Sequence, residues 1–199
     1  MKKILITGDS FAADWQVKYN IVGWPNLIGQ RYQVTNLAQA GCGEYKIYKQ
    51  LASQNLSNFD IVLISHTSPY RIYCSSHPVH KNDPLHANSD FIYSDVVENV
   101  DKRSDLSNIK YYFENFFDMD HAKFIHRLIC KEIVNLTQNV SVIHLSFFDY
   151  QDVFEFNNFL SFYDIFKNHR GSVNHLNEMG NKIVYKKLIE VLENENMAD

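Results

Sequence analysis

Short apolar runs recur along the chain, and longer amphipathic segments or loops separate them. The runs cover residues 3–8, 32–38, 59–65 and 140–147. An apolar run of about 4–8 residues between turn signals is typical of a strand buried on both faces of a parallel sheet. The pattern therefore predicts a sheet strand at each of these places.

Between and after these runs, apolar residues recur at helical spacing. The predicted helices cover residues 43–54, 107–138 with a break near 118–120, and 176–194, and a helical stretch after residue 10 is interrupted near 23–25. In the last helix the spacing turns Met179, Ile183, Leu188 and Leu192 inward. The aromatic segment 151–170 fits a strand, a short helix or a packed loop.

Strands that alternate with helices predict an α/β fold: one domain over residues 1–199, with three layers and a mostly parallel sheet flanked by helices. In such sheets ligands bind at the carboxyl ends of the strands. Three segments follow predicted strands and should share that edge: Ser10, the turn at 40–43, and the segment 66–71.

The stretch from about residue 66 to 104 lacks clear periodicity and carries three of the four prolines. Long irregular segments inside a compact domain are uncommon and usually have a function. We expect an insertion that forms part of a pocket wall at the edge of the sheet.

Composition and charge mainly exclude certain partners and locations for this protein. The 199 residues carry a net charge of −4, which does not suggest a nucleic-acid or acidic-lipid partner. No apolar run approaches the roughly 18 residues of a membrane span or the roughly 7 of a signal-peptide core. Cys42, Cys74 and Cys130 form no C-x-x-C pair and are interpreted as reduced thiols. We expect a cytoplasmic protein with no membrane association, whose oligomeric state the sequence leaves open.

Candidate chemistry begins at Gly8-Asp9-Ser10, directly after the first predicted strand. No further glycine follows until Gly23, so a G-x-G-x-x-G dinucleotide loop is absent. A serine at a strand-to-helix turn is presented at the sheet edge, where free backbone N–H groups at a helix start suit a nucleophile that generates an oxyanion. The alternative is that Asp9 or Ser10 only caps the helix.

Asn174-His175-Leu176 lies just before the last helix. Together with Gly-Asp-Ser near the start, this histidine makes the chain resemble the SGNH, or GDSL-like, hydrolase family. The resemblance implies a flavodoxin-like fold, Ser10 as nucleophile and His175 as general base. It also implies that Gly41, in Asn36-Leu37-Ala38-Gln39-Ala40-Gly41, matches the glycine whose backbone N–H joins that of the serine in the oxyanion hole.

Two family positions are not matched. The third block of the family is Gly-x-Asn-Asp, but here the third strand runs into Ser65-His66-Thr67-Ser68 without an asparagine, which leaves Thr67 or Ser68 as hydroxyl donors to the oxyanion. The family also places an aspartate three residues before the histidine, where this chain has Ser172. Either a Ser–His dyad acts alone, or Ser172 or an acid from elsewhere supports the histidine. The candidate acids are Asp149, Asp164 and Glu178.

Further histidines and aromatic residues are assigned structural roles. His77, His80 and His86 are interpreted as solvated loop residues because no cysteine or acid pattern completes a zinc site, so we expect no metal and no organic cofactor. His144, inside a strand, is expected to be a hydrogen-bonded core residue. The aromatic stripe 112–117 is expected to be core.

The sequence thus favours a serine esterase that hydrolyses a small acyl ester, such as an O-acetyl group on a carbohydrate. Tyr70 and Arg71 are candidates for substrate binding at the sheet edge. Two alternatives stay open: a catalytically impaired domain that binds a glycan or a protein, and an acyltransferase that uses the same residues.

Overall fold

A computed structural model describes residues 1–149, 154–171 and 175–194. The strands are β1 (Lys3–Gly8), β2 (Gln33–Asn36), β3 (Ile61–His66), β4 (Ser141–Ser146) and β5 (Phe159–Ser161). The α-helices are α1 (Gln16–Tyr19), α2 (Trp24–Ile28), α3 (Glu44–Ala52), α4 (Tyr93–Asn99), α5 (Ser107–Asn115), α6 (Met119–Thr137), α7 (Tyr163–Asn168) and α8 (Glu178–Asn194). Two 3-10 turns, η1 (Leu56–Asn58) and η2 (Ser104–Leu106), complete the elements.

The five strands form one parallel sheet in the order β2-β1-β3-β4-β5. This is the flavodoxin-like strand order, in which the chain reverses direction across the sheet between β1 and β3. The predicted α/β fold is confirmed, and the four strands predicted from apolar runs are present. The ambiguous segment 151–170 contains the short edge strand β5 and helix α7.

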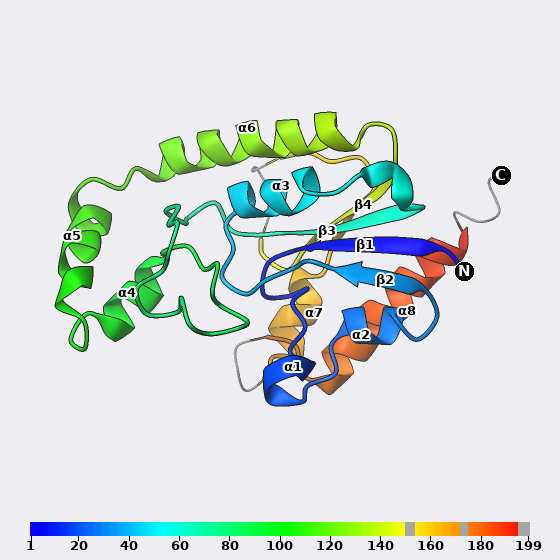
Figure 1. Ribbon diagram of the computed structural model, residues 1–199, viewed down its shortest axis with the longest axis horizontal. Coiled ribbons are helices and arrows are strands. Elements are labelled where there is room, and N and C mark those ends of the chain that lie inside the picture. Colours follow the sequence, from blue (N-terminus) through cyan, green and yellow to red (C-terminus); the bar gives the residue numbers. More distant parts are fainter. Residues whose placement is uncertain (150–153, 172–174, 195–199) are drawn as a thin grey trace.

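Helices cover both faces of the sheet (Figure 1). On one face α3 and α6 pack over Leu5, Val62 and Ile64, and on the other face α2 and α8 pack over Ile4 and Leu63. This alternation follows from strand geometry, since successive side chains of a strand point to opposite faces. No helix among the described residues is long and apolar enough to cross a membrane.

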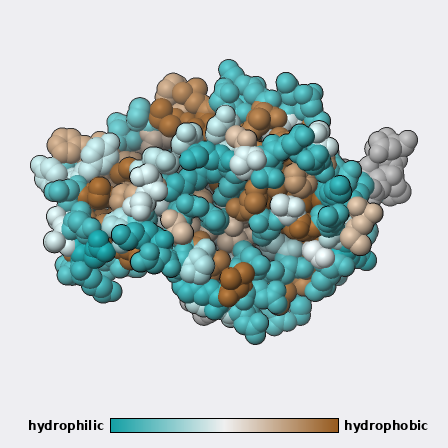
Figure 2. Space-filling view, viewed as in Figure 1, coloured by the Kyte–Doolittle hydropathy of each residue, from teal (hydrophilic) through white to brown (hydrophobic). Residues whose placement is uncertain are grey.

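The sequence pattern misassigned the buried face of α6 and the start of the buried face of α8. In α6 the buried residues are His126, Cys130, Ile133 and Thr137, which lie at helical spacing. Apolar spacing predicts an inward stripe that includes Ile125, Leu128 and Leu136, but these three residues are exposed. Figure 2 shows hydrophobic residues reaching the surface along the upper edge, where α6 lies. In α8 the predicted burial of Leu188 and Leu192 is confirmed, whereas Met179 is exposed and Val184 is buried.

The aromatic stripe in α5 was also wrongly expected to be core. Tyr112 and Phe116 are 46% and 63% exposed. Helices α4 and α5 project beyond the sheet at one end of the molecule (Figure 1). Helix α5 buries little because it packs on a small cluster formed with the segment after β3 and not on the sheet.

The segment after β3 is attached to the loop that follows β2. Lys46, in α3, forms a buried ion pair with Asp90 at 2.8 Å and donates to the carbonyl oxygens of Cys74 and Asn88, each at 2.7 Å. Asp90 also accepts from the backbone N–H of Gly43 at 2.8 Å. A buried charge with every partner satisfied fixes geometry, because breaking it would leave an uncompensated charge. These contacts hold the segment against the carboxyl edge of the sheet.

Candidate functional site

A cavity of about 540 Å³ lies at the carboxyl edge of the sheet, where β1, β2 and β3 end. Ser10, Gly41, Arg71 and His175 all line it, although they come from four distant parts of the chain. Ser10 and His175 also line a smaller adjoining cavity. The cavity lies at the reversal point of the strand order, where ligands bind in this class of sheet.

Ser10 sits in a tight turn that begins as β1 ends. Gly8 has a φ of +150°, and a Cβ there would lie 2.6 Å from the Cβ of Ser65, so only glycine lets β1 approach β3 this closely. Asp9 then accepts from the backbone N–H of Phe11 at 3.0 Å and from the hydroxyl of Ser65 at 3.3 Å. Trp15 donates from its indole N–H to the carbonyl oxygen of Ser10 at 2.7 Å.

The predicted helix start behind Ser10 is absent, since the first helix begins only at Gln16 and is four residues long. The turn closes instead through hydrogen bonds from the N–H groups of Ala12 and Ala13 to the carbonyl oxygen of Asp9, both at 3.1 Å. Within the described residues, no group hydrogen-bonds to the hydroxyl or the backbone N–H of Ser10. Both groups are available to a ligand.

Gly41 occupies a left-handed conformation, with a φ of +79°. A Cβ at this position would lie 2.2 Å from the Oγ of Ser89, so the loop requires glycine on both counts. Its carbonyl oxygen accepts from the N–H of Asp90 at 2.9 Å and from Nη1 of Arg71 at 3.1 Å. Its own N–H donates to no acceptor in the described part of the chain.

His175 lies between two aromatic rings from the Ser10 turn. Its ring centroid is 4.5 Å from that of Trp15 and 5.2 Å from that of Phe11. The segment is held at the start of α8 by Asn181, whose side chain donates to the carbonyl oxygen of Leu176 at 3.2 Å and accepts from the N–H of Trp24 at 2.9 Å. The packing brings the histidine to the cavity without a direct hydrogen bond to Ser10.

Arg71 is the charged residue at the centre of the site. Its Nε donates to the hydroxyl of Thr67 at 3.2 Å while Nη1 reaches Gly41. Burial raises the pKa of the neighbouring Asp9 to about 6, and the charge of Arg71 opposes that rise. The guanidinium therefore links the loops after β2 and β3 and lies close to a buried carboxyl group beneath Ser10.

The remaining predicted oxyanion and substrate residues lie elsewhere. Thr67 is fully buried beneath Arg71, and Ser68 lines a separate cavity of about 470 Å³ between α3, α5 and α6. Neither of them, nor Tyr70, is among the residues that line the cavity with Ser10. Arg71 lines both cavities.

The acids considered as partners for His175 do not reach the cavity. Asp149 and Asp164 are exposed, and Glu178 is paired with Lys182 at 2.6 Å in an exposed ion pair. Ser172 lies outside the described residues. Among the described residues, the acids that line the cavity are Asp90, Asp95 and Glu98, all from the segment after β3. Sequence reasoning missed them because nothing in that irregular segment indicates which side chains turn inward.

The interpretation of the insertion histidines as solvated is wrong. His77 is fully buried, and His80 and His86 are only partly exposed. The Nε2 atoms of His77 and His80 lie 3.3 and 3.0 Å from the carboxylate oxygens of Asp95. His80, His86 and Asp95 line the cavity that contains Ser10, so these residues form part of the site.

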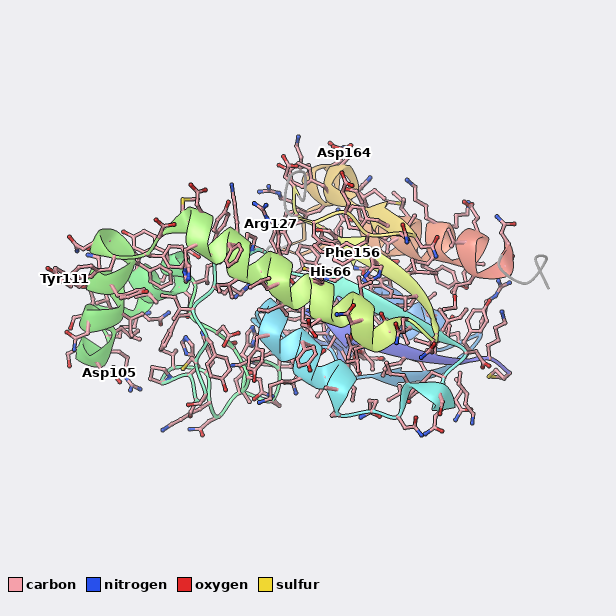
Figure 3. All side chains as sticks on the ribbon, turned by 90° about the horizontal axis from the view of Figure 1, so that it is seen from above. His66, Asp105, Tyr111, Arg127, Phe156 and Asp164 are labelled. Carbon is pink, nitrogen blue, oxygen red and sulfur yellow. The ribbon has the colours of Figure 1, made fainter. Side chains whose placement is uncertain are left out.

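A second buried polar chain lies beneath the site and was not predicted as a unit. Nδ1 of His66 lies 2.5 Å from Glu44, and Nε2 of His66 lies 2.9 Å from Nδ1 of His144. Figure 3 shows His66 beside Phe156, whose ring stacks on it at 4.2 Å. Burial raises the pKa of Glu44 and lowers that of His66 to about 3, so burial favours the neutral form of each group. The expectation that His144 is a hydrogen-bonded core residue is confirmed.

The buried group of Glu44, His66 and His144 positions the end of β3. The other carboxylate oxygen of Glu44 accepts from the backbone N–H of Thr67 at 3.2 Å, immediately after the last residue of the strand. Since Thr67 in turn accepts from Arg71, the buried polar chain supports the guanidinium that reaches the Gly41 loop.

No protein-family model matches the chain, and no curated protein matches it. A solved structure from Desulfitobacterium hafniense DCB-2, provisionally described as a lipolytic protein of the G-D-S-L family, matches with a TM-score of 0.49. The two sequences are 12% identical, and the match covers 94% of this chain and 97% of that chain. The site is therefore interpreted from the residues of this chain.

Proposed function

We propose that this protein is a serine esterase that cleaves a small acyl ester in the cavity lined by Ser10 and His175. One observation carries the proposal: Ser10, Gly41 and His175 come from three distant segments and line one cavity. Their order along the chain is the one that resembles SGNH hydrolases. Ser10 attacks the ester carbonyl, His175 accepts its proton and returns it to the leaving alcohol, and water then releases the acyl group.

The negative charge that develops on the carbonyl oxygen is stabilised by backbone donors. The N–H groups of Ser10 and Gly41 are the proposed pair, since neither has an acceptor among the described residues. Arg71 is the proposed third group that stabilises the oxyanion, in place of Thr67 and Ser68. It fixes the Gly41 carbonyl and brings a positive charge to the cavity wall, where a developing oxyanion gains most from it.

The absence of a direct Ser10–His175 hydrogen bond is compatible with this mechanism. Catalytic hydrogen bonds are often long without substrate and tighten in the reacting complex. The Trp15 and Phe11 rings restrict His175 to a position beside the serine turn. A neutral imidazole is required to accept the serine proton, so activity should rise with pH through a single ionisation of His175.

An O-acyl carbohydrate is the proposed substrate class, because the cavity combines hydroxyl and carboxylate groups with aromatic rings. Ser89, Ser94, Asp95 and Glu98 supply polar groups suited to sugar hydroxyls, and Phe148 and Phe166 supply aromatic surface. Transfer of the acyl group to an alcohol other than water would use the same residues. A domain that only binds such a ligand is the competing function.

Hydrolysis of small acyl esters by the purified protein tests the proposal. We expect measurable turnover that falls by about 10⁴-fold or more in Ser10→Ala and in His175→Ala, as for single triad residues in a serine protease. Ser57→Ala is a matched control, because Ser57 lies in an exposed turn far from the cavity. Turnover that is unchanged in Ser10→Ala, in protein that melts like the wild type, would contradict the proposal.

A further inference from the structure

His77, His80 and Asp95 form a cluster at one wall of the Ser10 cavity. One nitrogen from each histidine and one oxygen of the carboxylate all lie within 4.8 Å of one another. His77 and His80 come from the irregular part of the segment after β3, and Asp95 comes from the first turn of α4. The fold of this segment thus brings together two imidazoles and one carboxylate that are up to 18 residues apart in sequence.

The spacing of these atoms suits a transition-metal ion. A tetrahedron with metal–ligand bonds of about 2.0–2.1 Å has edges of about 3.3–3.4 Å. The Oδ2 atom of Asp95 lies 3.3 Å from Nε2 of His77 and 3.2 Å from Nε2 of His80. Small movements would therefore place all three groups on one ion. Imidazole together with carboxylate is a ligand set that zinc and neighbouring divalent metals accept.

A second observation points to a ligand. The side chain of His77 is fully buried, and its Nε2, which faces Asp95, has no hydrogen-bond partner within the described residues. The 3.3 Å approach to the carboxylate lacks the direction of a hydrogen bond. A buried polar atom without a partner costs free energy, and a metal ion at this point would satisfy it.

The other ring nitrogen of His77 accepts a long hydrogen bond, 3.3 Å, from the backbone N–H of Val79. This contact places the ring proton on Nε2 when no metal is bound. A neutral imidazole that binds a metal ion through Nε2 carries its ring proton on Nδ1, so metal binding moves the proton from Nε2 to Nδ1. The Val79 contact is the bond that metal binding weakens.

We propose that His77, His80 and Asp95 bind a divalent zinc-type metal ion whose remaining coordination position faces the Ser10 cavity. His80 and Asp95 line that cavity, whereas His77 lies behind them. Three protein ligands leave room for a water molecule or for an oxygen atom of a bound ligand. The site goes beyond the esterase proposal and does not depend on it.

Metal binding to the untagged protein tests this proposal directly. The protein is treated with a chelator, dialysed, and titrated with Zn²⁺ by equilibrium dialysis and with Co²⁺ by visible absorption. We expect one equivalent of each ion per chain. Removal of a ligand in His80→Ala or Asp95→Asn should weaken binding by at least about 100-fold, because even outer partners of metal ligands are worth about 10–100-fold. His121→Ala is the control, since His121 is exposed and outside the cluster.

Two results would overturn the proposal. One is binding well below one equivalent in wild-type protein that circular dichroism shows to be folded. The other is equal affinity in the wild type, His80→Ala and Asp95→Asn. Asp95→Asn keeps the size of the side chain, so it separates loss of a ligand from loss of the fold. Because neither readout uses ester hydrolysis, failure of the metal site and failure of the esterase proposal are distinguishable.

Discussion

Replacement of Gly41 by alanine probes the loop that supplies one proposed oxyanion donor. The backbone there has a φ of +79°, a region that costs an L-residue roughly 1–2 kcal/mol. The added Cβ would also lie 2.2 Å from the Oγ and 2.7 Å from the Cβ of Ser89. Relieving an overpacked contact costs about 1–3 kcal/mol more. The free energy of unfolding should therefore fall by about 2–5 kcal/mol in Gly41→Ala.

For a chain of this length each kcal/mol lowers Tm by about 2–4 °C, so a loss of about 4–20 °C is expected in thermal melting. Ester hydrolysis should fall more steeply. The loop must shift to accept the Cβ, and loss of one oxyanion donor costs about 10²–10³ in kcat. Gly29→Ala is a matched control because its Cβ would meet nothing closer than 3.4 Å and lies in a helix cap outside the cavity.

The double variant Gly41→Ala with Ser89→Gly separates the two causes. It removes the two closest contacts and leaves the left-handed backbone and the 3.1 Å approach to the Ser89 Cα. Part of the lost Tm should return, while the strain of the left-handed residue stays. A Gly41→Ala protein as stable and as active as the wild type would refute both the loop geometry and its role in the site.

Three further changes test the packing and electrostatics around the site. Burial raises the pKa of Asp9 from 3.8 to about 6, so the contribution of Asp9 to stability is greatest below pH 3.8 and falls by about 3 kcal/mol as the pH rises past about 6. In urea unfolding, Asp9→Asn should lack this part of the pH dependence, and a pH dependence equal to that of the wild type would contradict the prediction. Leu188→Ala, at a fully buried position, should lower the free energy of unfolding by about 2–5 kcal/mol, whereas Met179→Ala, at an exposed position, should lower it by less than about 0.5 kcal/mol. Equal effects would show that α8 packs through a different face. Arg71→Lys keeps the charge but not the forked geometry that reaches Gly41, so kcat/KM should fall by about 10–100-fold; an unchanged value would remove Arg71 from the site.

Two features could be predicted from the sequence because they depend on short-range patterns. One is the sheet, and the other is the shared edge to which it brings Ser10, Gly41 and the segment after β3. Apolar runs such as residues 59–65 indicate buried strands, and the carboxyl ends of parallel strands share an edge. Gly41 is identified through the resemblance to SGNH hydrolases, and its left-handed φ of +79° gives a physical reason for glycine at that position.

The buried face of α6, the path of the segment after β3 and the burial of His77 depend on long-range contacts that no local pattern encodes. The inward face of α6 carries two polar residues, His126 and Thr137. His126 lies 3.7 Å from the buried Glu44, and the hydroxyl of Thr137 donates to a carbonyl oxygen of its own helix. Hydrophobic spacing alone therefore predicted the wrong face of this helix. The segment after β3 is held by the Lys46–Asp90 ion pair, whose partners are far apart in sequence. Burial of His77 follows from that folding and not from its neighbours in the sequence.

Covalent labelling of Ser10 is the most direct measurement of the central claim. A fluorophosphonate reacts with a serine whose proton is removed by a base and whose developing charge is stabilised by nearby donors. The account predicts a single adduct per chain, mapped by mass spectrometry to Ser10, that is lost in Ser10→Ala and strongly slowed in His175→Ala. Absence of an adduct in folded protein, or an adduct that persists in Ser10→Ala, would contradict the account and favour a domain that only binds its ligand.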